Sequence, residues 1–185
     1  MKYDYVFWDF NGTILDDVKL CYDILIEMLK EEKRPIVSFE AYLMIFDFPV
    51  ESYYAKVYDL EKTSYKELAH RFIRKYQPRS LEINLHENVE KVIGILNDLG
   101  VKQVLLSASE EKNLMAQLKH FQIDHLFIKV LGTSNVYAKS KLDVARDYVR
   151  EKDIHPSQVL MIGDTLHDAE VAHNLGFDVV LFSKG

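Results

Sequence analysis

Three kinds of feature are scarce in this sequence, and each absence excludes a class of protein. The chain has one cysteine, Cys21, so no disulfide can form within it, and a reducing compartment suits it. It has no run of about 18 apolar residues, so we expect no membrane span. It has no excess of basic residues, and its formal net charge of −6 argues against a general partner among nucleic acids or anionic membranes.

The composition is that of an ordinary globular protein. Hydrophobic residues make up 48% and charged residues 28% of the 185 positions, which is enough for a sizeable core. The first apolar run is short and ends at Asp9, so we expect no secretory leader. We therefore expect a cytoplasmic enzyme domain that is a monomer or a weak dimer.

Five short apolar runs, rich in β-branched residues, predict buried strands. Continuous apolar runs of this kind, rather than alternating ones, are typical of a parallel sheet covered on both faces. The predicted strands are Tyr3–Asp9, Val101–Ser107, Phe127–Leu131, Gln158–Gly163 and Asp178–Phe182.

Helical patterns separate the later strands. Ser140 is placed to cap one of these helices, and Gly100 and Gly176 are placed to end two others. The alternation predicts an α/β fold with a doubly wound, Rossmann-like parallel sheet of about five strands. The helical patterns run from Val89 to Leu99, Leu114 to Phe121, Leu142 to Val149 and Leu166 to Leu175.

The segment 16–81 interrupts the alternation because it contains helical patterns only. The simplest interpretation is an all-helical insertion over 16–81, which divides an α/β core into 1–15 and 82–185. Its helices are predicted at Val18–Lys30, Ser38–Phe46, Val50–Tyr58 and Ser64–Tyr76. A group of aromatic residues can either form the core of the insertion or close over a site; these are Tyr42, Phe46, Phe48, Tyr53 and Tyr54.

Polar residues end three of the predicted strands. Asp9 ends the first strand, Ser107 the second and Asp164 the fourth. Ligands of doubly wound sheets bind at the carboxyl ends of the strands, so we expect these residues at one edge. Asp168 follows Asp164 by about one helical turn and can face the same side. The three carboxylates suit a hard cation such as Mg²⁺.

The acidic pair also has a simpler interpretation as helix capping. Thr165 can be the N-cap, with Asp168 favoured by the helix dipole. The motif by itself supports both interpretations equally. Asp9 at the same edge of the sheet favours the metal site.

Two further segments are candidates for phosphate binding. Ser107-Ala108-Ser109 lies between a strand and a helix, where backbone N–H groups and a hydroxyl can hold an anion. Ordinary N-capping explains Ser109, so Ser107 is the better candidate. Lys139 and Lys141 precede a later helix, and either lysine can neutralise a phosphate.

In order and spacing, these motifs resemble those of the haloacid dehalogenase superfamily of phosphatases. The family motifs are Asp-x-Asp-x-Thr, a strand-ending Ser or Thr, a Lys, and Gly-Asp-x-x-x-Asp. They correspond here to 9–13, Ser107, Lys141 or Lys139, and 163–168. The helical insertion resembles the cap of the subgroup that contains phosphoglycolate phosphatase and β-phosphoglucomutase.

The resemblance implies Mg²⁺-dependent hydrolysis of a small phosphorylated metabolite through an aspartyl-phosphate on Asp9. It implies that Mg²⁺ is held by Asp9, the backbone carbonyl of Asn11, Asp164 and, through water, Asp168. Phosphoryl oxygens would be held by Ser107, Ala108 and a lysine. Lys141 is favoured because it starts a helix and matches the spacing of phosphoserine-phosphatase-like members, whereas Lys139 matches the spacing of the phosphoglycolate-like subgroup.

Asn11 departs from the family pattern, which has a second aspartate at this position. In the family that aspartate protonates the leaving group and then activates water, and an amide cannot exchange the proton. General acid–base catalysis is typically worth about 10²–10⁴-fold, so we expect slow turnover unless His167 or an acidic leaving group compensates. The alternative function is a catalytically weak regulatory protein that binds phosphate and metal.

Overall fold

The computed structural model describes residues 2–46, 48–133 and 140–183. The chain divides into two units, Met1–Asp17 with Ile83–Gly185, here called the α/β unit, and Val18–Glu82, here called the helical unit. Within the described ranges, no helix is long and apolar enough to cross a membrane. The predicted roles of the two parts as catalytic core (1–15 and 82–185) and cap (16–81) stay predictions.

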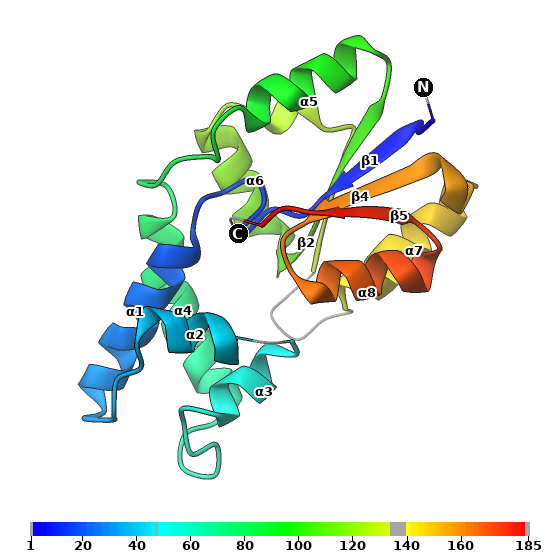
Figure 1. Cartoon of the computed structure of the whole chain (residues 1–185). Helices are drawn as coiled ribbons and strands as arrows, with labels where there is room; N and C mark the ends of the chain where they lie inside the picture. Colours follow the sequence, from blue (N-terminus) through cyan, green and yellow to red (C-terminus); the bar gives the residue numbers. More distant parts are fainter. Residues whose placement is uncertain (1, 47, 134–139, 184–185) are drawn as a thin grey trace. The chain divides into compact units, whose positions relative to one another are not determined.

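Five parallel strands form the sheet of the α/β unit, in the order β3-β2-β1-β4-β5 (Figure 1). The strand order reverses at β1, so the carboxyl end of β1 is the switch point where ligands of such sheets bind. The predicted doubly wound parallel sheet is thereby confirmed. The strands are β1 (Tyr5–Trp8), β2 (Lys102–Glu110), β3 (Lys129–Thr133), β4 (Val159–Gly163) and β5 (Asp178–Leu181).

Helices cover both faces of the sheet, with α5 and α6 on one face and α7 and α8 on the other (Figure 1). Alternate residues of β1 enter two separate cores: Trp8 packs with α5 and α6, and Phe7 packs with α7 and α8. The helices are α5 (Val89–Asp98), α6 (Glu111–His120), α7 (Lys141–Glu151) and α8 (Leu166–Leu175), with 3₁₀ turns η1 (Asp124–Leu126) and η2 (Pro156–Gln158). The α7 and α8 helices start beside the carboxyl ends of the strands.

Capping residues define the start of α7 and the end of α8. The Ser140 hydroxyl accepts a hydrogen bond from the Asp143 N–H at the start of α7, as predicted. Gly176 ends α8 in a left-handed conformation, which glycine adopts without a steric penalty. Local sequence therefore sets the start of α7 and the end of α8.

Four helices build the helical unit: α1 (Val18–Glu31), α2 (Phe39–Ile45), α3 (Val50–Ala55) and α4 (Tyr65–Arg79). The α1 and α4 helices are linked by ion pairs of Arg71 and Lys75 with Glu31, at 3.1 and 2.7 Å. The α4 helix continues past the predicted end at Tyr76, with Pro78 in its last turn. Proline is tolerated there because the missing hydrogen bond is confined to one turn.

The aromatic residues of the insertion pack on one another within the helical unit. Ring centroids lie 5.8 Å apart for Tyr42 and Phe46, 5.5 Å for Phe46 and Phe48, and 5.0 Å for Tyr53 and Tyr54. Tyr42, Tyr53 and Tyr54 are buried. These three tyrosines belong to the core of the helical unit, which is one of the two interpretations that the sequence left open, whereas Phe46 and Phe48 are partly exposed.

Gly132 and Gly94 provide a matched test of the close approach between β3 and α6. A Cβ at Gly132 would lie 2.7 Å from Glu111 Cα and 2.8 Å from the Ser109 carbonyl oxygen, whereas nothing lies within 4 Å of a Cβ at Gly94 in α5. We expect Gly132→Ala to lower the free energy of unfolding by about 1–3 kcal/mol because backbone atoms would have to shift. Gly94→Ala should raise it by about 0.5–1 kcal/mol because alanine favours helix. Urea unfolding measures both changes, and equal effects would contradict this packing.

Candidate active site

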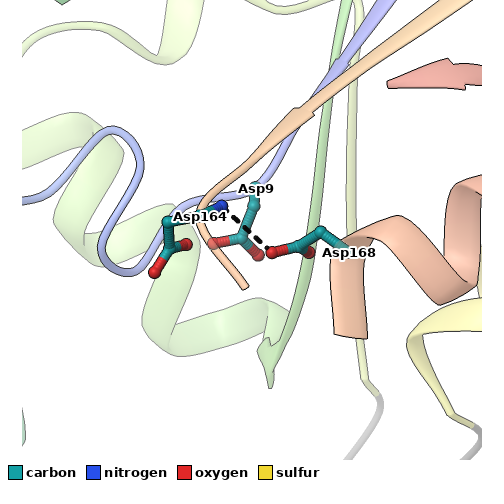
Figure 2. A group of neighbouring side chains, drawn as sticks. All are labelled: Asp9, Asp164 and Asp168. Carbon is teal, nitrogen blue, oxygen red and sulfur yellow. Dashed lines mark hydrogen bonds between the residues drawn. The ribbon is translucent and has the colours of Figure 1, made fainter. Parts of the chain in front are cut away.

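Asp9, Asp164 and Asp168 converge at the carboxyl end of β1. Asp9 follows β1 and donates its backbone N–H to the Ile162 carbonyl of β4, at 2.8 Å. Asp164 follows β4, and Asp168 lies in the first turn of α8. One carboxylate oxygen from each aspartate lies within 4.8 Å of the others, and Figure 2 shows the three groups side by side. The topology therefore assembles an oxygen-rich cluster from distant parts of the chain.

The Asp168 carboxylate forms part of the predicted helix cap and also lies in the acidic cluster. Its Oδ2 accepts hydrogen bonds from the Thr165 N–H at 3.0 Å and the Thr165 hydroxyl at 2.7 Å. It also accepts from the Asp164 N–H at 3.2 Å (Figure 2). Thr165 and Asp168 also form a capping box at the start of α8. Oδ1 accepts from Lys141. Capping thus orients Asp168 within the acidic cluster.

Lys141 is a buried lysine that joins two of the aspartates. It is the first residue of α7, and its Nζ forms ion pairs with Oδ1 of Asp9 and Oδ1 of Asp168. Its side chain is only 3% exposed, which is rare for a lysine without partners. The alternative phosphate ligand, Lys139, lies outside the described residues, so the choice between the two lysines stays a prediction.

Burial dominates the electrostatics of the cluster. It raises the pKa of Asp9 to about 8, and the charges of Asp168 and Asp164 add to this effect while Lys141 opposes it. Burial also raises the pKa of Asp164 to about 6, against a hydrogen bond from Thr13. Although burial acts in the same direction on Asp168, Lys141 and Thr165 hold its pKa below the ordinary value.

The negative charge of the cluster exceeds the positive charge that Lys141 supplies. Three carboxylates with oxygens this close form a donor set of hard ligands, which fits Mg²⁺. A bound divalent cation would favour the ionised carboxylates and lower their pKa values again. On charge and ligand chemistry, therefore, the residues present fit the expected metal.

The turn after β1 is shaped to fit against Asp164. Gly12 has a φ of +77°, and a Cβ at this position would lie 2.3 Å from Asp164 Oδ2. Both the backbone conformation and the space therefore require glycine. The Thr13 hydroxyl donates to Asp164 Oδ1 at 2.9 Å. The Asn11-Gly12-Thr13 segment thus holds a proposed metal ligand in place.

Asn11 is hydrogen-bonded on both sides of its carboxamide. Its Nδ2 donates to Asp17 Oδ2 at 2.7 Å. Its Oδ1 accepts from the Ser109 hydroxyl at 3.0 Å and, at a longer 3.5 Å, from the Ser107 hydroxyl. Both Asp17 and Ser109 are site residues that sequence reasoning missed.

The interpretation of Ser109 as a helix cap is wrong. The β2 strand continues past Ser107 to Glu110, with a register shift against β3, and Glu110 is the N-cap of α6. Ser107 is buried and accepts from the Ser109 N–H at 3.1 Å, whereas Ala108 is exposed. The irregular strand end thus directs both serine hydroxyls to Asn11, which no local pattern indicates.

His167, the suggested substitute for a missing acid, lies in α8. Its Nδ1 is 3.8 Å from Glu170 Oε2 and its side chain is 25% exposed. Burial lowers its pKa below the ordinary histidine value. This contact of the His167 ring is with Glu170, a residue of the same helix one turn further along.

Comparison with known proteins identifies the family. The model of haloacid dehalogenase-like hydrolases matches residues 6–182, so the chain belongs to this family, and the resemblance in the sequence is confirmed. A phosphoglycolate phosphatase from Pasteurella multocida is 30% identical over 102 residues, which are 55% of this chain and 46% of that protein. A phosphoglycolate phosphatase from Haemophilus influenzae is 28% identical over 128 residues, which are 68% of this chain and 57% of that protein. The chain thus matches about half the length of these relatives.

A solved structure supports the same fold. A haloacid dehalogenase-like family hydrolase from Streptococcus pneumoniae superimposes with a TM-score of 0.84 at 20% identity, covering 100% of this chain and 86% of that one. At this level of identity the likeness establishes the architecture. The chemistry has to be argued from the residues of the site.

Removal of Lys141 tests the electrostatic balance of the cluster. We expect Lys141→Met to lower the free energy of unfolding by about 3 kcal/mol or more, because Asp9 and Asp168 would be left buried without their partner. Lys152→Met is the matched control, since Lys152 is half-exposed and pairs with Glu151 at the surface, and it should leave stability unchanged. Urea unfolding at neutral pH compares the two, and equal stabilities would contradict the bridging role of Lys141.

Proposed function

We propose that the protein is a phosphatase that hydrolyses a small phosphomonoester with Asp9 as the nucleophile. The observation that carries this proposal is the cluster of Asp9, Asp164, Asp168 and Lys141 at the switch point of the sheet. The family is one of hydrolases, and the printed names of the curated relatives, phosphoglycolate phosphatases, support a small phosphorylated metabolite as the substrate.

The proposed reaction has two displacement steps at phosphorus. In the first, an Asp9 carboxylate oxygen bonds to phosphorus while the bond to the leaving alkoxide breaks, and the alkoxide takes up a proton. In the second, water attacks the aspartyl-phosphate and loses a proton, which releases phosphate and frees Asp9. Ser107, the backbone of Ala108 and Lys141 would stabilise the phosphoryl oxygens as charge shifts between them.

The acidic cluster would hold Mg²⁺ during this reaction. The proposed ligands are Asp9, Asp164 and the backbone carbonyl of Asn11. Asp168 would act through water, because its oxygens already accept from Lys141, Thr165 and the Asp164 N–H. The ion, when bound, neutralises negative charge on the carboxylates and the phosphoryl group.

Asn11 weakens the proton transfers of both steps. An amide neither donates a proton to the leaving alkoxide nor accepts one from water, so acidic leaving groups should be hydrolysed fastest. This residue is also the observation that favours the second candidate function, a regulatory protein that binds phosphate and metal but turns over poorly.

We propose that the helical unit acts as a cap that selects the substrate. This role rests on the family resemblance and on its position as an insertion after β1. Tyr42, Tyr53 and Tyr54 are buried in its interior, so substrate contacts would come from the more exposed side chains of the unit.

Asp9→Asn tests the nucleophile. We expect the rate of phosphate release from acyl and aryl phosphates to fall by at least about 10³-fold, since the variant cannot form the covalent intermediate. Asp178→Asn, at an exposed aspartate of β5, should be as active as wild type. Phosphate release and the intact mass of acid-quenched protein provide the readouts. Unchanged release by Asp9→Asn would contradict the proposal, whereas binding without repeated turnover in wild type would support the regulatory alternative.

Metal binding can be measured separately from turnover. We expect Mg²⁺ to raise the melting temperature of wild type in a saturable way, because it would bind the folded cluster only. Asp164→Asn should need at least about tenfold more Mg²⁺ for the same shift, since loss of even an outer-shell partner costs about 10–100-fold in affinity. Asp98→Asn, an exposed control in α5, should behave as wild type. Identical titrations of all three proteins would rule out Asp164 as a ligand.

A further inference from the structure

Asp17 is a buried aspartate whose carboxylate is hydrogen-bonded to the turn after β1. It is 2% exposed, and it immediately precedes α1. Its Oδ1 accepts from the Gly12 N–H at 2.8 Å, and its Oδ2 accepts from the Asn11 side chain at 2.7 Å. Both oxygens of Asp17 thus contact the segment that carries the family motif.

The chemistry of these contacts determines which way the Asn11 amide faces. An ionised carboxylate only accepts hydrogen bonds, so Asp17 pairs with the NH₂ end of the carboxamide. The carbonyl end of Asn11 then points to the hydroxyls of Ser109 and Ser107 in β2. A hydroxyl can donate or accept, so the serines alone would permit either orientation.

We propose that Asn11 and Asp17 form a matched amide–carboxylate pair, in which Asp17 is a positioning residue for Asn11. An aspartate at position 11 would instead need a hydrogen-bond donor at position 17, and the amide of asparagine is the donor closest in shape to Asp17. The functional part of this inference rests on the proposed phosphatase activity, whereas the pairing itself is a property of the folded chain.

Charge explains why an aspartate at position 11 does not fit beside Asp17. Its carboxylate would face the Asp17 carboxylate at hydrogen-bond distance, and two such buried groups either repel strongly or must take up a proton, which costs free energy at neutral pH. The site already holds Asp9, Asp164 and Asp168 around Lys141.

The exchanged pair preserves the hydrogen bonds. In Asn11→Asp/Asp17→Asn, the amide of residue 17 can donate to the new carboxylate, while its carbonyl oxygen still accepts from Gly12. In Asp17→Asn alone, the Asn11 carboxamide can flip so that its oxygen and its NH₂ group exchange places. The Ser109 hydroxyl can then accept a hydrogen bond from the NH₂ group. The Asn11→Asp variant alone has no such rearrangement, since both facing groups are acceptors.

The experiment compares wild type with these three variants, first by thermal unfolding with chelator and without substrate. We expect Asn11→Asp to lower the melting temperature by at least about 3 °C, and the exchanged pair to recover at least half of that loss. Asn11→Asp/Asp16→Asn is the matched control. It removes the same charge from the neighbouring, 58% exposed aspartate, so it should recover little.

Phosphate release with Mg²⁺ gives the second readout. We expect kcat of the exchanged pair to exceed that of wild type and of Asn11→Asp alone by at least about tenfold, with a smaller change in KM, because only there is the new carboxylate held in position for proton transfer. Intact-protein mass confirms that residue 11 is still an amide in wild type, since Asn-Gly sequences deamidate.

The two readouts separate the two proposals. Equal melting temperatures of Asn11→Asp and the exchanged pair overturn the matched pair, whatever the activities. Equal rates of these two variants overturn the positioning role. Absence of phosphate release in every protein, including wild type, overturns the proposed phosphatase function, and the melting temperatures then decide the pairing alone.

Discussion

The buried ion pairs of Lys141 with Asp9 and Asp168 are the interaction on which the site depends. They join the end of β1 to the starts of α7 and α8. Three segments that are far apart in sequence therefore meet at the ammonium group of Lys141. Taking these groups out of water is costly, and buried ion pairs add little net stability. Their consequence is specific geometry: the carboxylates are held together although they repel, and the cluster keeps excess negative charge for a cation.

The amide of Asn11 affects proton transfer in the proposed reaction more than it affects the binding of metal or phosphate. The ion pairs of Lys141 and the hydrogen bond from Thr13 to Asp164 do not involve the side chain at position 11. An amide at this position therefore leaves the acidic cluster and Lys141 in place, and it is a group that cannot exchange a proton. The hydrogen bonds from Asn11 to Asp17 and from Ser109 to Asn11 show that the amide is accommodated by its surroundings.

Much of the fold could be predicted because its signals are local. Continuous apolar runs identified the strands, and apolar spacing identified the helices of the sheet, with bounds that shift by a few residues. Ser140 and Gly176 at helix ends were equally local. Ser109 was misinterpreted because a serine before a helix is typical of a cap, whereas an irregular end of β2 makes the next residue the cap. Asp17 carried no pattern that separates it from a solvated aspartate.

The sequence by itself determined the order of strands and helices along the chain, the positions of Asp9 and Asp164 after their strands, and the family, since these depend on periodicity and short motifs. Only the tertiary structure decided which oxygen meets which donor. Lys141 lies between two carboxylates, Asp168 serves capping and the cluster at once, and Asp17 faces the amide of Asn11. These contacts depend on helix starts and strand ends that meet across long stretches of chain, where a displacement of a few ångströms changes the partner of a hydrogen bond.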